Sequence, residues 1–199
     1  MTDAQLNQYA LPRGPVGYLA GLVMRVGTQP VQAEIADLIT PLRSDQRVLE
    51  IGFGPGRLIG LIVERAPHVR ISGIDPSPVM LRQARQANRQ AISHGLVDLR
   101  SGHADSLPFD DTSFDAVVAV NNAPVWPDLP AGLREAHRVL RPRGRFVLSW
   151  HSAESPRFIQ RRLALAPRHL DAVESALRAE FPRVDLRHLT YSVAFVATA

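Results

Sequence analysis

The chain has 199 residues, of which 45% are hydrophobic and 21% are charged, and its formal net charge is +4. This length and composition predict one folded domain with a full hydrophobic core and exclude a disordered chain. Because no cysteine is present, disulfides, cysteine-based zinc sites and a cysteine nucleophile are excluded.

The N-terminal segment, residues 1–45, is predicted to be helical and to precede the first strand. One helix is expected over residues 16–26 and a better one over residues 30–42, where apolar side chains recur on one face. Residues 1–5 lack the basic region of a signal peptide, and residues 16–26 are too short to span a bilayer. We therefore expect a soluble cytoplasmic protein.

From residue 46 to residue 150, strand patterns alternate with helix patterns. This alternation predicts a Rossmann-like, doubly wound α/β fold with a mostly parallel sheet. The run Phe114–Val120 is apolar throughout, as expected of a strand at the centre of such a sheet. The predicted strands are 47–51, 69–74, 97–100, 114–120 and 145–150, and the predicted helices are 57–66, 77–93 and 129–140.

The C-terminal part, residues 151–199, has a different pattern. A helix is expected over residues 167–180, followed by two short β runs at 183–189 and 192–197. So few residues separate these runs that they can form only an antiparallel hairpin. No linker or repeat interrupts the chain, so residues 1–199 are expected to form a single domain.

A glycine-rich turn follows the first predicted strand. It has the pattern E-x-G-x-G-x-G, from Glu50 through Gly52 and Gly54 to Gly56. Glycines are needed where the backbone takes a positive φ or lets a ligand touch the main chain. A dinucleotide fold requires G-x-G-x-x-G, but Arg57 occupies the third glycine position, which disfavours NAD.

Asp75 ends the second predicted strand, at about the 20-residue distance from the glycine turn that one helix and one strand require. Its carboxylate can accept hydrogen bonds from both hydroxyls of a ribose. The alternative is that Asp75 caps the helix that begins near Ser77. Two further segments carry recognisable patterns, residues 102–109 and residues 140–146.

These four elements, in this order, resemble the class I S-adenosylmethionine-dependent methyltransferases, in particular the small-molecule group that includes the ubiquinone and menaquinone methyltransferases. The resemblance covers residues 46–150 and implies a seven-stranded sheet whose last strand is antiparallel. It implies S-adenosylmethionine as the cofactor, with Glu50 fixing its charged end. The residues it places around the cofactor are Glu50, Gly52, Gly54, Gly56, Asp75, Pro76, Ala104, Asp105 and Asn121.

The sequence departs from the family pattern at two places. His103 stands where relatives carry an acid that reaches the adenine amino group, so the adenine contact is expected from the backbone of Ala104 or from Asp105. Arg143 replaces one of the two glycines that usually precede the fifth strand. Asn121 can orient cofactor or substrate, or be an ordinary loop asparagine.

Three residues are candidates for the acceptor side. His151 follows the fifth strand and is the best candidate base, although a cap or surface histidine is the more ordinary interpretation. Trp126 can stack on an aromatic substrate or wedge its own loop. Tyr18, with Tyr9 and Met24, is expected in an N-terminal helical lid that favours a hydrophobic or aromatic acceptor; the alternatives are simple packing on the sheet or a dimer contact.

The function predicted is methyl transfer by in-line displacement from S-adenosylmethionine to a small, hydrophobic or aromatic metabolite. An RNA methyltransferase and a non-catalytic cofactor-binding protein are the alternatives. Nucleic acid is not the expected partner, because the densest arginine cluster, residues 134–145, lies mainly in the helix before the fifth strand. Residues 122–125 lack the Asn/Asp-Pro-Pro-aromatic motif of amino-group methyltransferases, and no histidine pattern indicates a metal.

Overall fold

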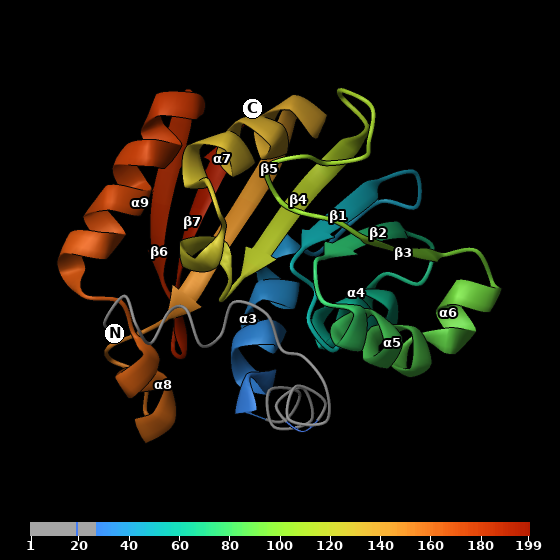
Figure 1. The fold of residues 1–199 in the computed structure, drawn as a ribbon, viewed down its shortest axis with the longest axis horizontal. Coiled ribbons are helices and arrows are strands. Elements are labelled where there is room, and N and C mark those ends of the chain that lie inside the picture. The colour runs from blue at the N-terminus through green and yellow to red at the C-terminus, as the bar shows by residue number, and fades with distance from the viewer. Residues whose placement is uncertain (1–18, 20–26) are drawn as a thin grey trace.

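In the computed structural model, Leu19 and residues 27–199 are described, and they form one sheet flanked by helices (Figure 1). The seven strands lie in the order β3-β2-β1-β4-β5-β7-β6. Only β7 runs antiparallel to its neighbours, β5 and β6. This confirms the predicted fold class. The strands are β1 (Arg47–Ile51), β2 (Arg70–Asp75), β3 (Val97–Ser101), β4 (Phe114–Val120), β5 (Leu140–His151), β6 (Arg183–His188) and β7 (Ser192–Thr198).

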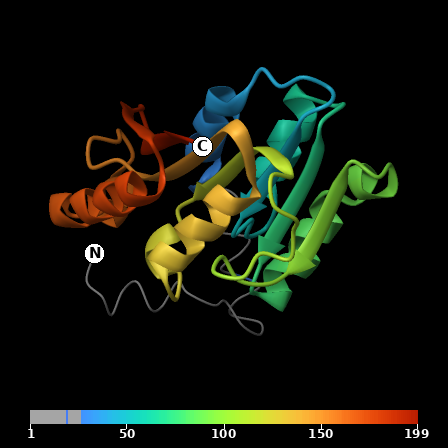
Figure 2. The ribbon, with the colours of Figure 1, turned by 90° about the horizontal axis from the view of Figure 1, so that it is seen from above.

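The helices cover both faces of the sheet, and Figure 2 shows α3 and α7 on opposite sides. One buried cluster joins α3 and α4 to the sheet, and a second joins α7 and α9 to its other face. The helices are α3 (Gln29–Ile39), α4 (Arg57–Arg65), α5 (Pro78–Ala87), α6 (Arg89–Ser93), α7 (Leu129–Val139), α8 (Phe158–Leu163) and α9 (Pro167–Glu180), with a 3-10 turn η1 (Ala123–Val125).

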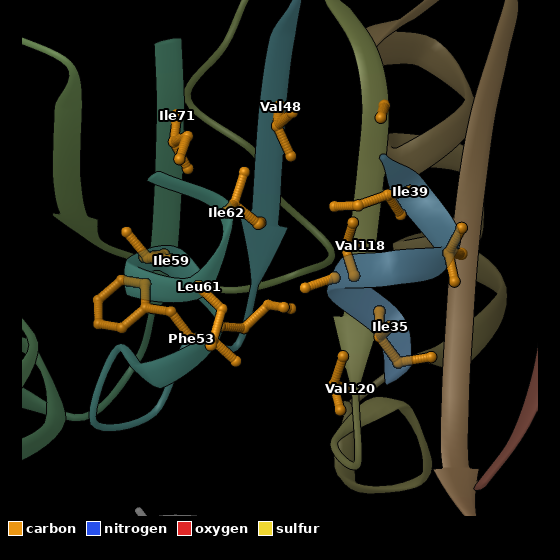
Figure 3. Packing of buried hydrophobic residues seen from close by; sticks show 14 of the residues in the cluster. Ile35, Ile39, Val48, Phe53, Ile59, Leu61, Ile62, Ile71, Val118 and Val120 are labelled. Carbon is orange, nitrogen blue, oxygen red and sulfur yellow. The ribbon is translucent and has the colours of Figure 1, made fainter. Parts of the chain in front are cut away.

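The central strand β4 shows why its sequence is apolar throughout. Val118 and Val120 pack against Ile35 of α3 in the cluster of Figure 3. Val117 and Ala119 point to the opposite face and belong to the second cluster. Because both faces of the strand are buried, neither set of alternating positions can be polar.

Short polar side chains and prolines start α5 and α7. The Ser77 hydroxyl accepts a hydrogen bond from Met80 N at 3.4 Å, and Pro78 is the first residue of α5. The Asp128 carboxylate likewise accepts one from Ala131 N at 2.9 Å at the start of α7. These contacts satisfy backbone N–H groups that have no partner inside the helix.

Two predicted elements differ from the structure. The helix expected over 77–93 is broken at Asn88, whose side-chain amide donates to Gly56 O and Ala84 O, both at 3.0 Å. The fifth strand begins at Leu140 rather than at residue 145, and a register shift between Phe114 and Ala116 accommodates the predicted turn as a bulge.

Helix α8 was not predicted, and the helix expected over 16–26 lies outside the described residues apart from Leu19. The hairpin of β6 and β7 agrees with the sequence-based expectation. Within the described part of the chain, no helix combines the length and the apolar character needed to cross a bilayer.

Candidate active site

A cavity of about 190 Å³ lies at the carboxyl ends of β1, β2, β4 and β5. Parallel α/β sheets place ligands at this edge, where the strand order reverses around β1 and β4. Gly56 and Asp105 are not among its lining residues, and Tyr18 lies outside the described part of the chain. The predicted site residues that line it are Glu50, Gly52, Gly54, Asp75, Pro76, Ala104, Asn121, Trp126 and His151.

The glycine turn takes the backbone conformation that its sequence predicts. Gly52 and Gly56 have φ values of 71° and 77°. A Cβ on Gly52 would lie 2.3 Å from the side-chain nitrogen of Asn122. Gly52 therefore permits both the turn and the close approach of the loop after β4.

Asp75 ties the glycine turn to the start of α5. One carboxylate oxygen accepts from Gly54 N and the other from Ser77 N, both at 2.8 Å. Burial raises the pKa of Asp75, and these two backbone hydrogen bonds oppose the rise. Asp75 thus contacts the helix start, as the capping alternative proposed, and also faces the cavity.

Glu50 lies beside Asp75 as a second buried acid. It is 2% exposed, and its Oε2 has no hydrogen-bond partner among the described residues. Burial, and then the charge of Asp75, raise the pKa of Glu50 well above its ordinary value. A buried carboxyl group without a partner is costly, so this end of the cavity is suited to a cationic ligand.

Asn121, like Glu50, has a buried polar side chain without a partner among the described residues. Its backbone has a φ of 57°, and both atoms of its side-chain amide are buried without a hydrogen bond in the described structure. Buried amides normally find partners in protein, water or ligand. The position of Asn121 on the cavity wall suits the last of these.

Asn122 connects two parts of the site, although the sequence did not indicate it as a site residue. Its amide nitrogen donates to Ile51 O at 2.7 Å and to Gly52 O at 3.1 Å. Its amide oxygen accepts from Trp126 Nε1 at 3.1 Å. Trp126 also packs closely against Gly132 of α7. It therefore both holds its own loop against α7 and lines the cavity. The only signal available was the polar pair that ends an apolar strand.

His151 ends β5 and is 5% exposed. Burial lowers the pKa of His151 to about 4, so the imidazole is neutral at pH 7. Its Nδ1 is buried and has no partner among the described groups. The neighbouring Trp150 donates from Nε1 to Leu163 O at 2.7 Å, which fixes α8 against this end of the cavity.

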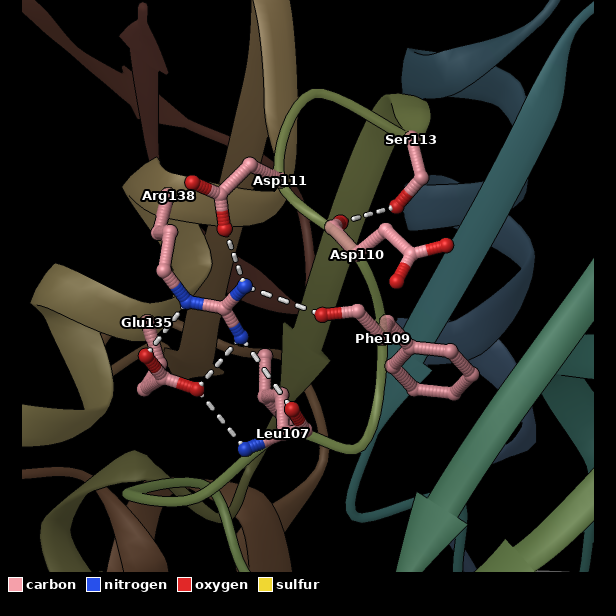
Figure 4. A network of polar contacts seen from close by, with 7 residues as sticks. All are labelled: Leu107, Phe109, Asp110, Asp111, Ser113, Glu135 and Arg138. Carbon is pink, nitrogen blue, oxygen red and sulfur yellow. Dashed lines mark hydrogen bonds and ion pairs between the residues drawn. The ribbon is translucent and has the colours of Figure 1, made fainter.

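A polar network holds the segment after β3, which contributes His103 and Ala104 to the cavity wall. Figure 4 shows Arg138 of α7 donating to Leu107 O at 3.1 Å, while Leu107 N donates to Glu135 at 2.8 Å. The hydrogen bond from Arg138 lowers the pKa of Glu135. The residues of this network are spread over two segments, so the sequence pattern did not reveal it.

The described residues contain no group of three or more histidine, aspartate or glutamate side chains arranged to hold a metal ion. Charged and polar groups in the cavity are instead distributed unevenly. The β1–β2 side has the two acids, and the β4–β5 side has neutral polar and aromatic side chains.

Comparisons with known proteins identify the family of this chain. The family described as "Methyltransferase domain" matches residues 49–148, from β1 to β5. The demethylmenaquinone methyltransferase of Deinococcus radiodurans is 42% identical over 106 residues, which cover 53% of this chain and 43% of that protein. The nocamycin O-methyltransferase of Saccharothrix syringae is 34% identical over 166 residues, covering 81% and 58%. The chain thus spans about half the length of these two relatives.

A solved structure has a similar fold over most of the chain. The protein, from Methanococcus maripaludis and named as an S-adenosylmethionine-dependent methyltransferase, matches with a TM-score of 0.76 over 91% of both chains at 16% identity. At this level of identity, its likeness shows the architecture alone. This chain belongs to the methyltransferase family whose domain model matches residues 49–148.

Proposed function

We propose that this protein transfers a methyl group from S-adenosylmethionine to a small, hydrophobic or aromatic molecule. The observation that carries the proposal is the buried Glu50 Oε2, which has no hydrogen-bond partner among the described residues and shares one cavity with an aromatic wall. S-adenosylmethionine carries an ammonium group, which would pair with the ionised Glu50. The cofactor supplies a methyl group that is already activated by a positively charged sulfur.

Cofactor residues are assigned by their positions in the cavity. Asp75 retains lone pairs beyond those used by Gly54 N and Ser77 N, so it can also accept from ribose hydroxyls. Pro76 lines the wall beside it. Ala104 is favoured over Asp105 for the adenine contact, because Ala104 lines the cavity and Asp105 does not.

The remaining residues hold the acceptor and exclude water. Trp126 and Trp150 provide aromatic surface, and Leu163 of α8 adds an apolar contact. Such walls orient an acceptor toward the methyl group and keep water from competing with it. A pKa near 4 makes His151 a weak base, so it suits a hydrogen bond to the acceptor better than removal of a proton from an ordinary alcohol.

Two observations support a small molecule over RNA. The relatives in the comparison are named as methyltransferases for demethylmenaquinone and nocamycin. In the arginine cluster, Arg138 is paired with Glu135 and Asp111, and Arg141 is paired with Asp115 at 2.8 Å. These pairs neutralise guanidinium groups that a nucleic-acid surface would need to leave free.

The test is incubation with methyl-labelled S-adenosylmethionine and, separately, a small-metabolite extract and total RNA. We expect protein-dependent label in an organic-extractable small molecule, with the Glu50→Gln variant as the negative control. Label in RNA would support the alternative enzyme. Binding of S-adenosylhomocysteine without transfer to either pool would support a non-catalytic protein.

A further inference from the structure

The two ends of the cavity differ in charge. The order β2-β1-β4-β5 places Asp75 and His151 three strand spacings apart, or about 14 Å. Glu50 and Asp75 lie toward the β1–β2 end. None of the described lining residues is an arginine, although arginine supplies every one of the 23 basic residues in the chain.

Both tryptophans of the chain line the β4–β5 end. Their indole N–H groups are already used, since Trp126 donates to Asn122 Oδ1 and Trp150 donates to Leu163 O. They therefore offer ring surface to a ligand rather than hydrogen-bond donors. Ring surface of this kind favours an aromatic or other flat apolar molecule.

The neutral side chain of His151 can provide a polar contact at the β4–β5 end of the cavity. His151 Nδ1 is buried without a partner in the described residues. In neutral imidazole one ring nitrogen donates and the other accepts, and the structure leaves both tautomers open. A hydroxyl group both donates and accepts, so it satisfies Nδ1 in either tautomer. An ammonium can only donate and a carboxylate can only accept.

The charge of the ligand discriminates more strongly between a hydroxyl group and a carboxylate at this end of the cavity. A carboxylate or phosphate bound here would lose its water, would meet no arginine of the described lining, and would lie in one cavity with two acids. Burying a charge without a partner is far more costly than burying a hydrogen-bonded neutral group. The cavity therefore discriminates by charge as well as by shape.

Building on the proposed function, we infer that the methyl acceptor is an uncharged aromatic compound whose hydroxyl group hydrogen-bonds to Nδ1 of His151, with its ring against Trp126 and Trp150. Gln32 of α3 and Asn121 after β4 also line the cavity with buried polar atoms that have no partner among the described residues, which makes them the competing contacts.

The experiment uses three probes that share a ring and differ in one group: 4-ethylphenol, 4-ethyltoluene and 4-ethylbenzoate. Each is titrated into the full chain saturated with S-adenosylhomocysteine while tryptophan fluorescence is recorded, because both tryptophans report on this end of the cavity. We expect the phenol to bind about tenfold more tightly than the toluene, as one net hydrogen bond allows, and the benzoate to bind most weakly.

Three variants assign the contact. His151→Phe should abolish the advantage of the phenol over the toluene while the toluene still binds, whereas His188→Phe on exposed β6 should preserve it. Gln32→Leu should also preserve it. Loss of the advantage in Gln32→Leu but not in His151→Phe would overturn the assignment, and so would tightest binding of the benzoate to the wild type.

The wild-type ranking of the three probes tests the uncharged hydroxyl-bearing acceptor even if His151→Phe does not fold, and Gln32→Leu then tests the competing contact of Gln32. Failure of the proposed function is separately visible, because it would appear as no binding of S-adenosylhomocysteine in the same protein. Normal S-adenosylhomocysteine binding with equal affinity for all three probes would reject only the hydroxyl-bearing acceptor.

Discussion

The ligand-free Glu50→Gln variant should become more stable than the wild type as pH rises, and it should bind the cofactor more weakly. In the wild type, burial raises the pKa of Glu50 above the ordinary value of 4.5. Between that value and the raised pKa, the folded protein binds more protons than the unfolded chain, so its stability falls as pH rises. Glutamine has no such proton and removes this loss.

The magnitude follows from the linkage relation. One group contributes at most about 1.4 kcal/mol per pH unit inside its window. For a domain of this size, about 1 kcal/mol corresponds to roughly 2–4 °C in Tm. The difference in Tm between Glu50→Gln and the wild type should therefore increase by about 3–5 °C per pH unit at most. Asp75, whose pKa is also raised, leaves part of the slope in the variant.

Binding should change in the opposite direction. Removing one partner of a buried charge pair typically costs about 2–5 kcal/mol, or at least about 30-fold in affinity. In the wild type, the ligand's ammonium requires Glu50 to ionise, so binding releases a proton and tightens as pH rises toward the raised pKa. Glu50→Gln should bind S-adenosylhomocysteine weakly, with no such proton release.

Two assays measure these effects. Thermal unfolding between pH 5 and pH 8 compares the wild type, Glu50→Gln and the control Glu64→Gln, whose side chain is 63% exposed. Calorimetry in two buffers of different ionisation enthalpy measures the released proton. Parallel Tm profiles for the wild type and Glu50→Gln, or equal affinities, would refute the role assigned to Glu50.

Three further variants test neighbouring parts of the site. Asp75→Asn should lower S-adenosylhomocysteine affinity by about 1–3 kcal/mol, because one amide hydrogen would face a backbone N–H; unchanged affinity in calorimetry would contradict the ribose role. Gly52→Ala should cost about 2 kcal/mol or more of stability in denaturant unfolding, because its φ is 71° and its Cβ would lie 2.3 Å from Asn122. Arg138→Gln should lower the free energy of unfolding by about 2–3 kcal/mol at neutral pH. The loss should be smaller in acid, because protonation of Glu135 already weakens its pairing with Arg138 in the wild type. Hydrogen exchange at Leu107 should then accelerate, and unchanged protection would argue against the network.

The parts of the fold that could be predicted are those that depend on the pattern of neighbouring residues in the sequence. Strand β4 has the predicted bounds, Phe114–Val120, because burial on both faces leaves a continuous apolar run. The hairpin of β6 and β7 followed from a separation too short for any crossover. The glycine turn at residues 50–56 followed from the positive φ values that glycine permits.

What could not be predicted depends on contacts between distant segments. Asn88 breaks the predicted helix because its amide reaches Gly56 O, 32 residues away. Asn122 connects Gly52 of the glycine turn, 70 residues away in sequence, to the nearby Trp126. Burial lowers the pKa of His151 to about 4, and this burial arises from the fold around β5 rather than from neighbouring residues in the sequence. No periodicity or motif in a single sequence records such partners.

The most direct test of the central claim is calorimetric titration of the wild-type protein with S-adenosylhomocysteine, with NAD as the comparison. The cavity at the carboxyl ends of β1, β2, β4 and β5 predicts saturable one-to-one binding of S-adenosylhomocysteine and no heat with NAD. Absence of S-adenosylhomocysteine binding, or saturable binding of NAD, would contradict the account.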